Sequence, residues 1–510
     1  MKQGLRFVVL GNAVIAFSVA VYLFAIPAYT LVQALNDPGL SSARVPRVAF
    51  AWHRSLSDRY DPWARERVAS GLATQLSAYD VSGTEWPMFG SVFYLWTTEA
   101  LQEAWEEDPS LARTSPGEYA RGAIAAAAAL VADPNHAAWV KRRWGEEYLH
   151  RENLFYRMLL ISGFTSYEKL SGDHQYQSQL RDQVESLARE LDDSPFGLLD
   201  DYPGECYPVD ILTVIAAIRR ADEVLGTDHS EFARRALRAF EGARLDPNTQ
   251  LPAYVADSQS GQGFGSARGV GLSFMLIWAP ELWPESASAW YSRYEERFWQ
   301  EGSLLAGFRE YPASLSDMDG WLLEVDAGPV VAGYGTAASA FGIGATRANG
   351  DFEKAYPLSA QALVLSWPLP DGTLLLPRLL SNYSDAPYLG EAALLFSLTR
   401  KPVFHSPSAA GRLPLLVYIV IGVYVVMALA WIGLAMRRLS KWNKASSPQG
   451  CPSTGWQLGM WGTLVVAGVI AAALSWVFAC ASLLLAAQFL PRARRKAGEN
   501  GPDWGLGMTP

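Results

Sequence analysis

Residues 178–221, SQLRDQVESLARELDDSPFGLLDDYPGECYPVDILTVIAAIRRA, contain one complete helix–loop–helix cycle. Four apolar residues recur at helical spacing on an otherwise charged first helix: Leu180, Val184, Leu187 and Leu191. A loop rich in acids and aromatics follows, and residues 211–221 are then dominated by small and β-branched side chains. The first periodicity predicts an amphipathic helix facing solvent, and the second segment predicts a buried helix. The stretch therefore predicts an αα-hairpin with one outer and one inner helix.

The same cycle repeats six times along residues 64–399. The inner helices are predicted to begin near Met88, Asn153, Pro208, Arg268, Val330 and Pro387. A self-similar period of this length is typical of repeated supersecondary units. Six hairpins predict an all-α fold, an (α/α)6 barrel of twelve helices within residues 38–412. The loops that enter the inner helices then meet at one mouth of the barrel.

Two other outer helices carry their own signals. Ser115-Pro116-Gly117-Glu118 reads as a capping box with proline at the first helical position. Phe232, Ala236 and Phe240 form a second apolar stripe. The Gly-Tyr-Gly at residues 333–335 is an alternative candidate for a nucleotide-binding loop, but no strand is predicted before it. The inner helix at residues 330–346 is the interpretation we prefer.

Three apolar segments predict membrane-spanning helices beside the barrel. They are an N-terminal anchor within residues 1–37, a helix at 413–436 and a helix at 461–490, separated by a basic loop at 437–460 and followed by a tail at 491–510. Each is long enough for a bilayer core of about 30 Å. A cleaved signal peptide is the alternative for the first, but its apolar stretch is long and no small-residue cleavage site stands out. We expect a multi-pass protein of the cell (inner) membrane.

Charge sets the expected topology and excludes one partner class. The flanks 1–37 and 413–510 hold ten Lys/Arg and three Asp/Glu, so residues 38–412 hold 32 basic and 48 acidic side chains, net −16. Such an acidic domain repels nucleic acid. Basic residues in 437–444 favour a cytoplasmic loop and therefore a domain outside the cytoplasm, whereas those in 492–496 argue the opposite. We expect the domain outside, in the periplasm of a two-membrane cell.

The mouth loops supply the candidate chemistry. The expected catalytic residues are Asp210, Glu85, Asp326, Asp201 and Cys206, and the expected substrate-binding residues are Trp86, Tyr156, Tyr202, Tyr207, Arg268 and Tyr383. Acids beside aromatics suit general acid/base work on an uncharged substrate. Facing carboxylates separate each other's pKa values, so that one donates a proton and another accepts. No HxxxH or HExxH spacing occurs, so neither a metal nor a cofactor is expected.

Each candidate has a structural alternative. Asp210 follows Pro208 and could cap its helix, and Asp326 before Gly-Pro could serve a turn. Cys206, the one cysteine of the domain, could be a small buried residue, and it has no disulfide partner there.

Two stretches resemble a known family. Residues 88–94 (Met-Phe-Gly-Ser-Val-Phe-Tyr), 139–144 (Trp-Val-Lys-Arg-Arg-Trp), 153–156 (Asn-Leu-Phe-Tyr) and 167–173 (Tyr-Glu-Lys-Leu-Ser-Gly-Asp) form the first, and residues 201–210 (Asp-Tyr-Pro-Gly-Glu-Cys-Tyr-Pro-Val-Asp) form the second. In order and spacing the chain, over about residues 84–400, resembles the linalool dehydratase/isomerase family. The resemblance implies an (α/α)6 barrel acting on terpenoid alcohols outside the cytoplasm.

The chain departs from that family at its site. Met158 stands where the family has a histidine, and Asp201 and Asp210 stand at the spacing of two family cysteines, with Cys206 between them. The C-terminal spans are also foreign to the soluble family enzyme. A thiol mechanism is therefore in doubt, although carboxylates can still transfer protons.

The leading expectation is a membrane-anchored lyase or isomerase that dehydrates, hydrates or isomerises a lipophilic, terpenoid-like alcohol. A glycosidase, lyase or epimerase acting on carbohydrate is the first alternative, because the barrel alone does not choose a substrate. A non-catalytic platform in a membrane export or assembly complex is the second. The expected partners are a small lipophilic or sugar-like substrate and the lipid bilayer, and the sequence is compatible with a homo-oligomer.

Overall fold

The computed structural model describes residues 2–76, 81–318, 320–324, 326–382, 385–403 and 408–443. The described chain is mostly helical, with a few short strands. It divides into two compact units. One unit is Pro27–Val423, and the described residues of the other are 2–26 and 424–443.

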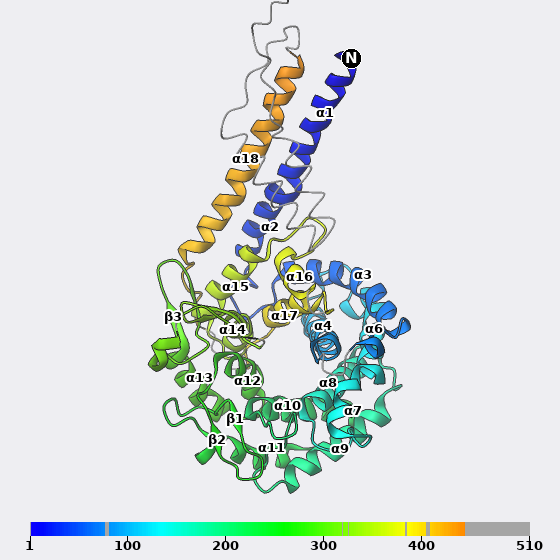
Figure 1. Ribbon diagram of the computed structural model, residues 1–510, viewed down its shortest axis with the longest axis vertical. Helices are drawn as coiled ribbons and strands as arrows, with labels where there is room; N and C mark the ends of the chain where they lie inside the picture. The colour runs from blue at the N-terminus through cyan, green and yellow to red at the C-terminus, as the bar shows by residue number, and fades with distance from the viewer. Residues whose placement is uncertain are drawn as a thin grey trace, which may run out of the picture. The chain divides into compact units, whose positions relative to one another are not determined.

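Six helices of the larger unit contact one another in a closed cycle. They are α4 (Val81–Glu107), α8 (Leu154–Ser171), α10 (Pro208–Leu225), α12 (Gly269–Leu282), α14 (Thr336–Ala348) and α17 (Leu389–Leu398). Each packs against the next, and α17 packs against α4. We call these the six central helices; Figure 1 shows them around a common centre.

Other helices pack on the outside of the central ones. The longer ones are α3 (Arg47–Ala69), α6 (Arg121–Ala132), α9 (Gln177–Asp193), α13 (Pro284–Phe298) and α15 (Phe352–Ser366); the shorter ones are α5 (Pro116–Tyr119), α7 (Ala138–Trp144), α11 (Ser230–Ala236) and α16 (Leu375–Ser381). Short 3-10 segments are η2 (Leu72–Gln75), η3 (Pro109–Leu111), η4 (Pro134–Ala137), η5 (Leu237–Phe240), η6 (Gly242–Arg244) and η7 (Ala313–Met318).

Helix α9 contacts both α8 and α10, and its predicted stripe is buried. The Ser115 cap is also present, since Ser115 Oγ accepts from the N–H of Glu118.

Four central helices begin within two residues of the predicted positions, and two do not. Helix α4 begins at Val81, seven residues before Met88. The helix passes through Pro87 because the carbonyl of Gly83, which loses its usual N–H partner there, accepts from Arg67 instead. The sequence alone does not reveal this replacement.

The second difference is the predicted helix at residues 330–346, which begins only at Thr336. Strand β6 (Gly328–Val331) pairs antiparallel with β5 (Leu322–Glu324) and with β7 (Tyr334–Gly335). Ala332 and Gly333 form the tight connection, with φ of 50° and 83°. A helix cannot contain two successive residues with left-handed φ, so the glycine-rich segment forms a hairpin before the helix. The remaining strands are β1 (Val255–Ala256), β2 (Gly263–Phe264), β3 (Trp299–Glu301) and β4 (Ala306–Phe308).

Aromatic side chains fill the centre of the ring. Trp96 of α4 lies 4.7 Å from Trp278 of α12 and 5.2 Å from Phe396 of α17, between ring centroids. Phe93 lies 5.8 Å from Phe341 of α14. All except Phe341 are buried, so side chains from opposite parts of the ring form one core. This core closes the base of the site described below.

Among the described residues, two apolar helical segments are long enough to cross a membrane: Leu10–Leu35 and Leu415–Ser440. The first runs through α1 (Lys2–Val19), a π-helical segment η1 (Ala20–Ala25) and α2 (Ile26–Leu35). The second lies in α18 (Leu415–Asn443), which extends seven residues past the predicted end at 436. The third predicted span, 461–490, and the tail, 491–510, lie outside the described residues.

Candidate functional site

A cavity of about 330 Å³ lies at the N-terminal ends of the six central helices. Every central helix, or the loop before it, contributes to its wall. The lining residues are Glu85, Trp86, Phe89, Phe93, Phe155, Asp201, Tyr202, Tyr207, Val209, Asp210, Tyr254, Val270, Gly271, Phe274, Asp326, Ala337, Phe341, Leu389 and Ala393. The lining residues thus come from positions 85 to 393 of the sequence. This is the arrangement expected if the loops before the central helices converge on one mouth.

The four predicted acids, Glu85, Asp201, Asp210 and Asp326, line this one cavity. Glu85 and Asp201 are buried, Asp210 is half-buried and Asp326 is exposed. Carboxyl groups that share a small, partly dry space resist joint ionisation. Glu85, Asp201 and Asp210 accordingly hold their protons more tightly than they would in water.

Glu85 lies in the second turn of α4 and is 7% exposed. Its pKa is raised to about 8, mainly by burial and to a smaller extent by the charges of Asp210 and Asp326, against the lowering effect of the hydrogen bond from Tyr202. The Tyr202 hydroxyl donates to Glu85 Oε2 over 3.2 Å. A carboxyl with this pKa is mostly protonated at pH 7 and is able to donate its proton.

Asp210 lies in the first turn of α10 but does not cap the helix. Tyr207 occupies the N-cap position, and no side-chain hydrogen bond caps this helix. Burial raises the pKa of Asp210 to about 7, with the charge of Asp326 as the second cause. The capping alternative therefore does not account for the carboxylate, which faces the cavity.

Asp201 is held by the backbone of the preceding central helix. Its Oδ1 accepts from the N–H of Phe155 over 2.9 Å, whereas Oδ2 has no hydrogen-bond partner in the described part of the chain. Burial and the neighbouring charge of Asp210 raise its pKa well above the usual range. A fully buried carboxyl oxygen without a partner is costly unless a ligand or a proton satisfies it.

Asp326 and Tyr254 form the opposite wall. Asp326 lies in the turn between β5 and β6, and the Tyr254 hydroxyl donates to its Oδ2 over 2.9 Å. Arg268 stacks on the other side, 4.6 Å from the centroid of the Tyr254 ring, and pairs with Glu310 over 2.8 Å and with Glu324. Arg268 therefore supports the wall from behind and is not part of the lining.

The base of the cavity is apolar. Five phenylalanines line it: Phe89, Phe93, Phe155, Phe274 and Phe341. Their rings interlock; Phe89 meets Phe155 edge-on at 5.1 Å, and Phe274 lies 5.2 Å from Phe341. These five phenylalanines and Tyr254 are not among the site residues predicted from the sequence. The available signal was the presence of phenylalanine in the first two or three turns of the central helices.

Two further predicted site residues, Cys206 and Tyr156, do not line this cavity, and neither does Arg268. Cys206 is fully buried, and its carbonyl accepts from the N–H of Ala256 over 2.8 Å. Burial raises the pKa of its thiol, which is unfavourable for a nucleophile. Tyr156 lines a different cavity of about 200 Å³ together with Tyr148. Tyr383 lies outside the described residues.

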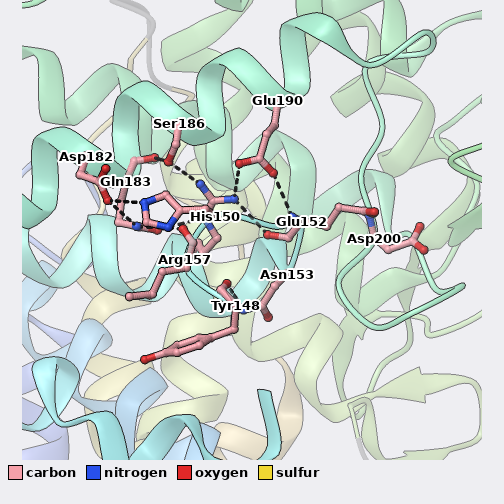
Figure 2. Close-up of polar contacts among 11 residues, drawn as sticks. Tyr148, His150, Glu152, Asn153, Arg157, Asp182, Gln183, Ser186, Glu190 and Asp200 are labelled. Carbon is pink, nitrogen blue, oxygen red and sulfur yellow. Dashed lines mark hydrogen bonds and ion pairs between the residues drawn. The ribbon is translucent and has the colours of Figure 1, made fainter. Parts of the chain in front are cut away.

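A buried polar network positions the loop that carries Asp201 (Figure 2). At its centre is Arg157 of α8, which is fully buried. Its guanidinium donates to three side chains of α9, over 2.7 to 2.9 Å: Gln183, Ser186 and Glu190. These bonds fix α8 against α9.

The network continues from α9 to the mouth loop (Figure 2). Glu190 Oε2 accepts from the N–H of Glu152 over 2.9 Å, and Glu152 Oε2 accepts from the N–H of Asp200 over 2.8 Å. The carbonyl of Asp200 accepts from the N–H of Asn153. Glu152 and Asn153 have φ of 37° and 56°, a costly backbone conformation that these bonds maintain. Asp201, the next residue, is thereby fixed at the cavity.

Within the described ranges no group of three or more His, Cys, Asp or Glu side chains is placed to hold a metal ion. No protein-family model matches the chain, and no curated protein matches it.

Proposed function

We propose that the protein is a membrane-anchored (α/α)6-barrel enzyme that dehydrates, hydrates or isomerises a small lipophilic alcohol by general acid/base catalysis. The proposed chemistry is that of the linalool dehydratase/isomerase family, which the sequence resembles. One cavity has four acidic side chains in its wall and five phenylalanines at its apolar bottom. This combination is the observation that carries the proposal. The closed cycle of central helices supports the barrel assignment.

The proposed reaction begins with Glu85, whose raised pKa keeps it protonated at pH 7. Its proton passes to the substrate hydroxyl, the carbon–oxygen bond breaks with both electrons leaving on water, and an allylic cation remains. A carboxylate then removes a proton from the adjacent carbon, and the electrons of that C–H bond form the new double bond. Asp326 is suited to be this base, because its bond from Tyr254 holds it at the wall. Hydration is the same sequence reversed.

The walls suit a cationic intermediate. Aromatic faces attract positive charge by about 0.5–2 kcal/mol each, more strongly where water is excluded. Phe89 and Phe155 are aromatic residues of the lining, and the apolar base leaves a lipophilic chain in contact with hydrocarbon rather than water. A volume of about 330 Å³ limits the substrate to a small molecule.

Membrane anchoring is supported by exposed apolar helices. Only 33% of the most apolar window in Leu10–Leu35 and 22% of that in Leu415–Ser440 is buried. Val426, Leu429 and Met436 are each more than 60% exposed. A helix that exposes this much hydrocarbon to water would aggregate, whereas a bilayer covers it. An anchor also keeps the cavity near a lipid-soluble substrate.

A carbohydrate substrate is the second candidate, favoured by the facing acids and by Trp86 at the wall. The phenylalanine base argues against it, because a sugar presents hydroxyl groups over most of its surface. No observation on the described residues specifically favours the third candidate, a non-catalytic binding platform.

The test is turnover of allylic alcohols of roughly five to ten carbons, a size suited to the cavity, by the full-length protein in H₂¹⁸O. Mass spectrometry follows both loss of water and entry of ¹⁸O into unreacted alcohol, which reports ionisation even when no product is released. Glu85→Gln is expected to lower both rates by about 100-fold or more. Glu147→Gln, an exposed acid of a neighbouring loop, is the matched control. Hydrolysis of aryl glycosides without ¹⁸O exchange would instead support the carbohydrate candidate.

A further inference from the structure

A second cavity of about 910 Å³ lies in the larger unit and shares no lining residue with the first. Its walls come from the end of α2, residues 36–48, the end of α4 and η3. Its charged lining residues are Asp37, Arg44, Arg47, Glu107, Asp108 and Lys401. We call it the α2 cavity.

The acids of the α2 cavity accept hydrogen bonds or form ion pairs within the protein. Asp37 accepts from the N–H groups of Gly39 and Arg47, over 2.9 and 2.6 Å. Asp108 accepts from the N–H of Ser110, and Glu107 pairs with Lys401 over 2.8 Å. The Ser110 hydrogen bonds lower the pKa of Asp108, and the charges of Arg47 and Arg44 also reach Asp108 and add to this lowering.

The exposed guanidinium groups of Arg44 and Arg47 form no hydrogen bond or ion pair with any described residue. Two guanidiniums on one wall, each with a fork of N–H donors, form a preferred arrangement for phosphate oxygens.

The loop that carries Arg44 is held in place by hydrogen bonds from a buried side chain. Arg347, fully buried at the end of α14, donates to the carbonyls of Gly39, Leu40 and Ser42 over 3.3 to 3.5 Å and to that of Arg44 over 2.7 Å. At Gly39 a Cβ would lie 2.5 Å from the carbonyl oxygen of Val45, so the loop packs too closely for any other residue. A wall fixed in this way loses little entropy when it binds a ligand.

The α2 cavity opens where the first apolar segment ends. Leu10–Leu35 stops one residue before the lining residue Asn36, and Tyr29, also on the wall, is 66% exposed. The Tyr356 hydroxyl fixes this end by donating to the carbonyl of Leu35 over 3.0 Å. Exposed tyrosine in the last turns of an apolar helix, and arginine just beyond it, are typical of the headgroup layer of a bilayer.

We propose that Arg44 and Arg47 bind the phosphate group of a membrane phospholipid in the α2 cavity. The inference rests on the proposed membrane anchoring and is independent of the reaction proposed for the first cavity. The same donors would accept free phosphate, so the two sources must be separated by experiment.

The experiment measures ligand binding to the full-length, detergent-solubilised protein by native mass spectrometry. The three probes are a short-chain phosphatidylglycerol, inorganic phosphate, and a diacylglycerol with the same chains but no phosphate. Arg44→Gln/Arg47→Gln is compared with Arg121→Gln/Arg189→Gln, a control pair of exposed arginines on α6 and α9 with the same change of charge. The expected result is that the first double variant binds phosphatidylglycerol at least tenfold more weakly, while the control pair binds as the wild type does.

Three outcomes would overturn the proposal: equal binding of diacylglycerol and phosphatidylglycerol, inorganic phosphate binding as tightly as the lipid, or an equal effect of both double variants. An unchanged melting temperature of the Arg44→Gln/Arg47→Gln protein excludes misfolding as the cause. Alkaline extraction of membranes tests the anchoring separately, because a protein that stays in the pellet is anchored whether or not the two arginines bind lipid.

Discussion

Glu85 and Asp210 of the first cavity lie in surroundings that differ strongly from water. Glu85 has an ordinary pKa of 4.5 that becomes about 8, and Asp210 has one of 3.8 that becomes about 7. Desolvation is the first cause for both. At about pH 5–6 both carboxyl groups have lost their protons in the unfolded chain but keep them in the folded protein. Folding at this pH is therefore accompanied by proton uptake.

This uptake predicts how stability changes with pH. Because the folded-state pKa values are raised, the stabilisation is complete below the unfolded pKa values and is lost as the pH rises through about 7 to 8. Each group contributes a slope of up to about 1.4 kcal/mol per pH unit between its unfolded and its folded pKa. Unfolding of the detergent-solubilised protein between pH 5.5 and 9 should show falling stability with rising pH. Glu85→Gln should flatten this slope and Glu147→Gln should leave it unchanged; a flat wild-type profile would contradict the buried-acid assignment.

Cys206 gives a second prediction at this scale. It lies between Asp201 and Asp210 in sequence, but its backbone pairing with Ala256 turns the side chain into the core. Cys206→Ala should therefore retain the alcohol turnover, at a stability cost of about 1–2 kcal/mol for the small space left. If a stably folded Cys206→Ala variant loses turnover, the thiol takes part in the reaction and this prediction is wrong.

At the scale of elements, the contact between α8 and α9 determines where Asp201 lies. Arg157→Met should remove about 2–4 kcal/mol of stability, because Glu190, Gln183 and Ser186 lose their shared donor. Denaturant unfolding measures the loss. Arg189→Met on the exposed face of α9 is the control and should change stability by no more than about 0.5 kcal/mol. Equal effects of the two changes would show that the network is not what fixes the loop.

The sequence predicted elements well where one face of a helix was marked by charge. The stripe of α9 followed from periodicity. The starts of α8, α10, α12 and α17 followed from the polar loops before them. The acids of the cavity were predictable because they stand in the loops before the central helices or in the first two turns of those helices. The phenylalanine base was not, since central helices are apolar all round and periodicity then does not reveal which side faces the cavity. The hairpin at residues 328–335 was missed because glycine permits several backbone conformations.

At the scale of the whole molecule, the proposed topology can be tested by reporter fusions. Alkaline phosphatase folds only outside the cytoplasm, so a fusion after Arg412 should be active if the barrel lies outside. A fusion after Asn443 should be inactive, because Arg437, Arg438 and Lys441 favour the cytoplasmic side. Immunoblotting of both fusions controls for expression. The reverse pattern of activity would place the domain in the cytoplasm.

The first cavity draws on all six central helices, from Glu85 to Ala393. A nascent chain on the ribosome accordingly has no such chamber until its sixth helical pair has emerged and closed against the first. Before that moment Glu85 and Asp210 stand in water as ordinary anions, unable to act as acids at neutral pH. The capacity for catalysis would then arise in a single late step of biosynthesis, and a prematurely terminated chain would be inert rather than partly active.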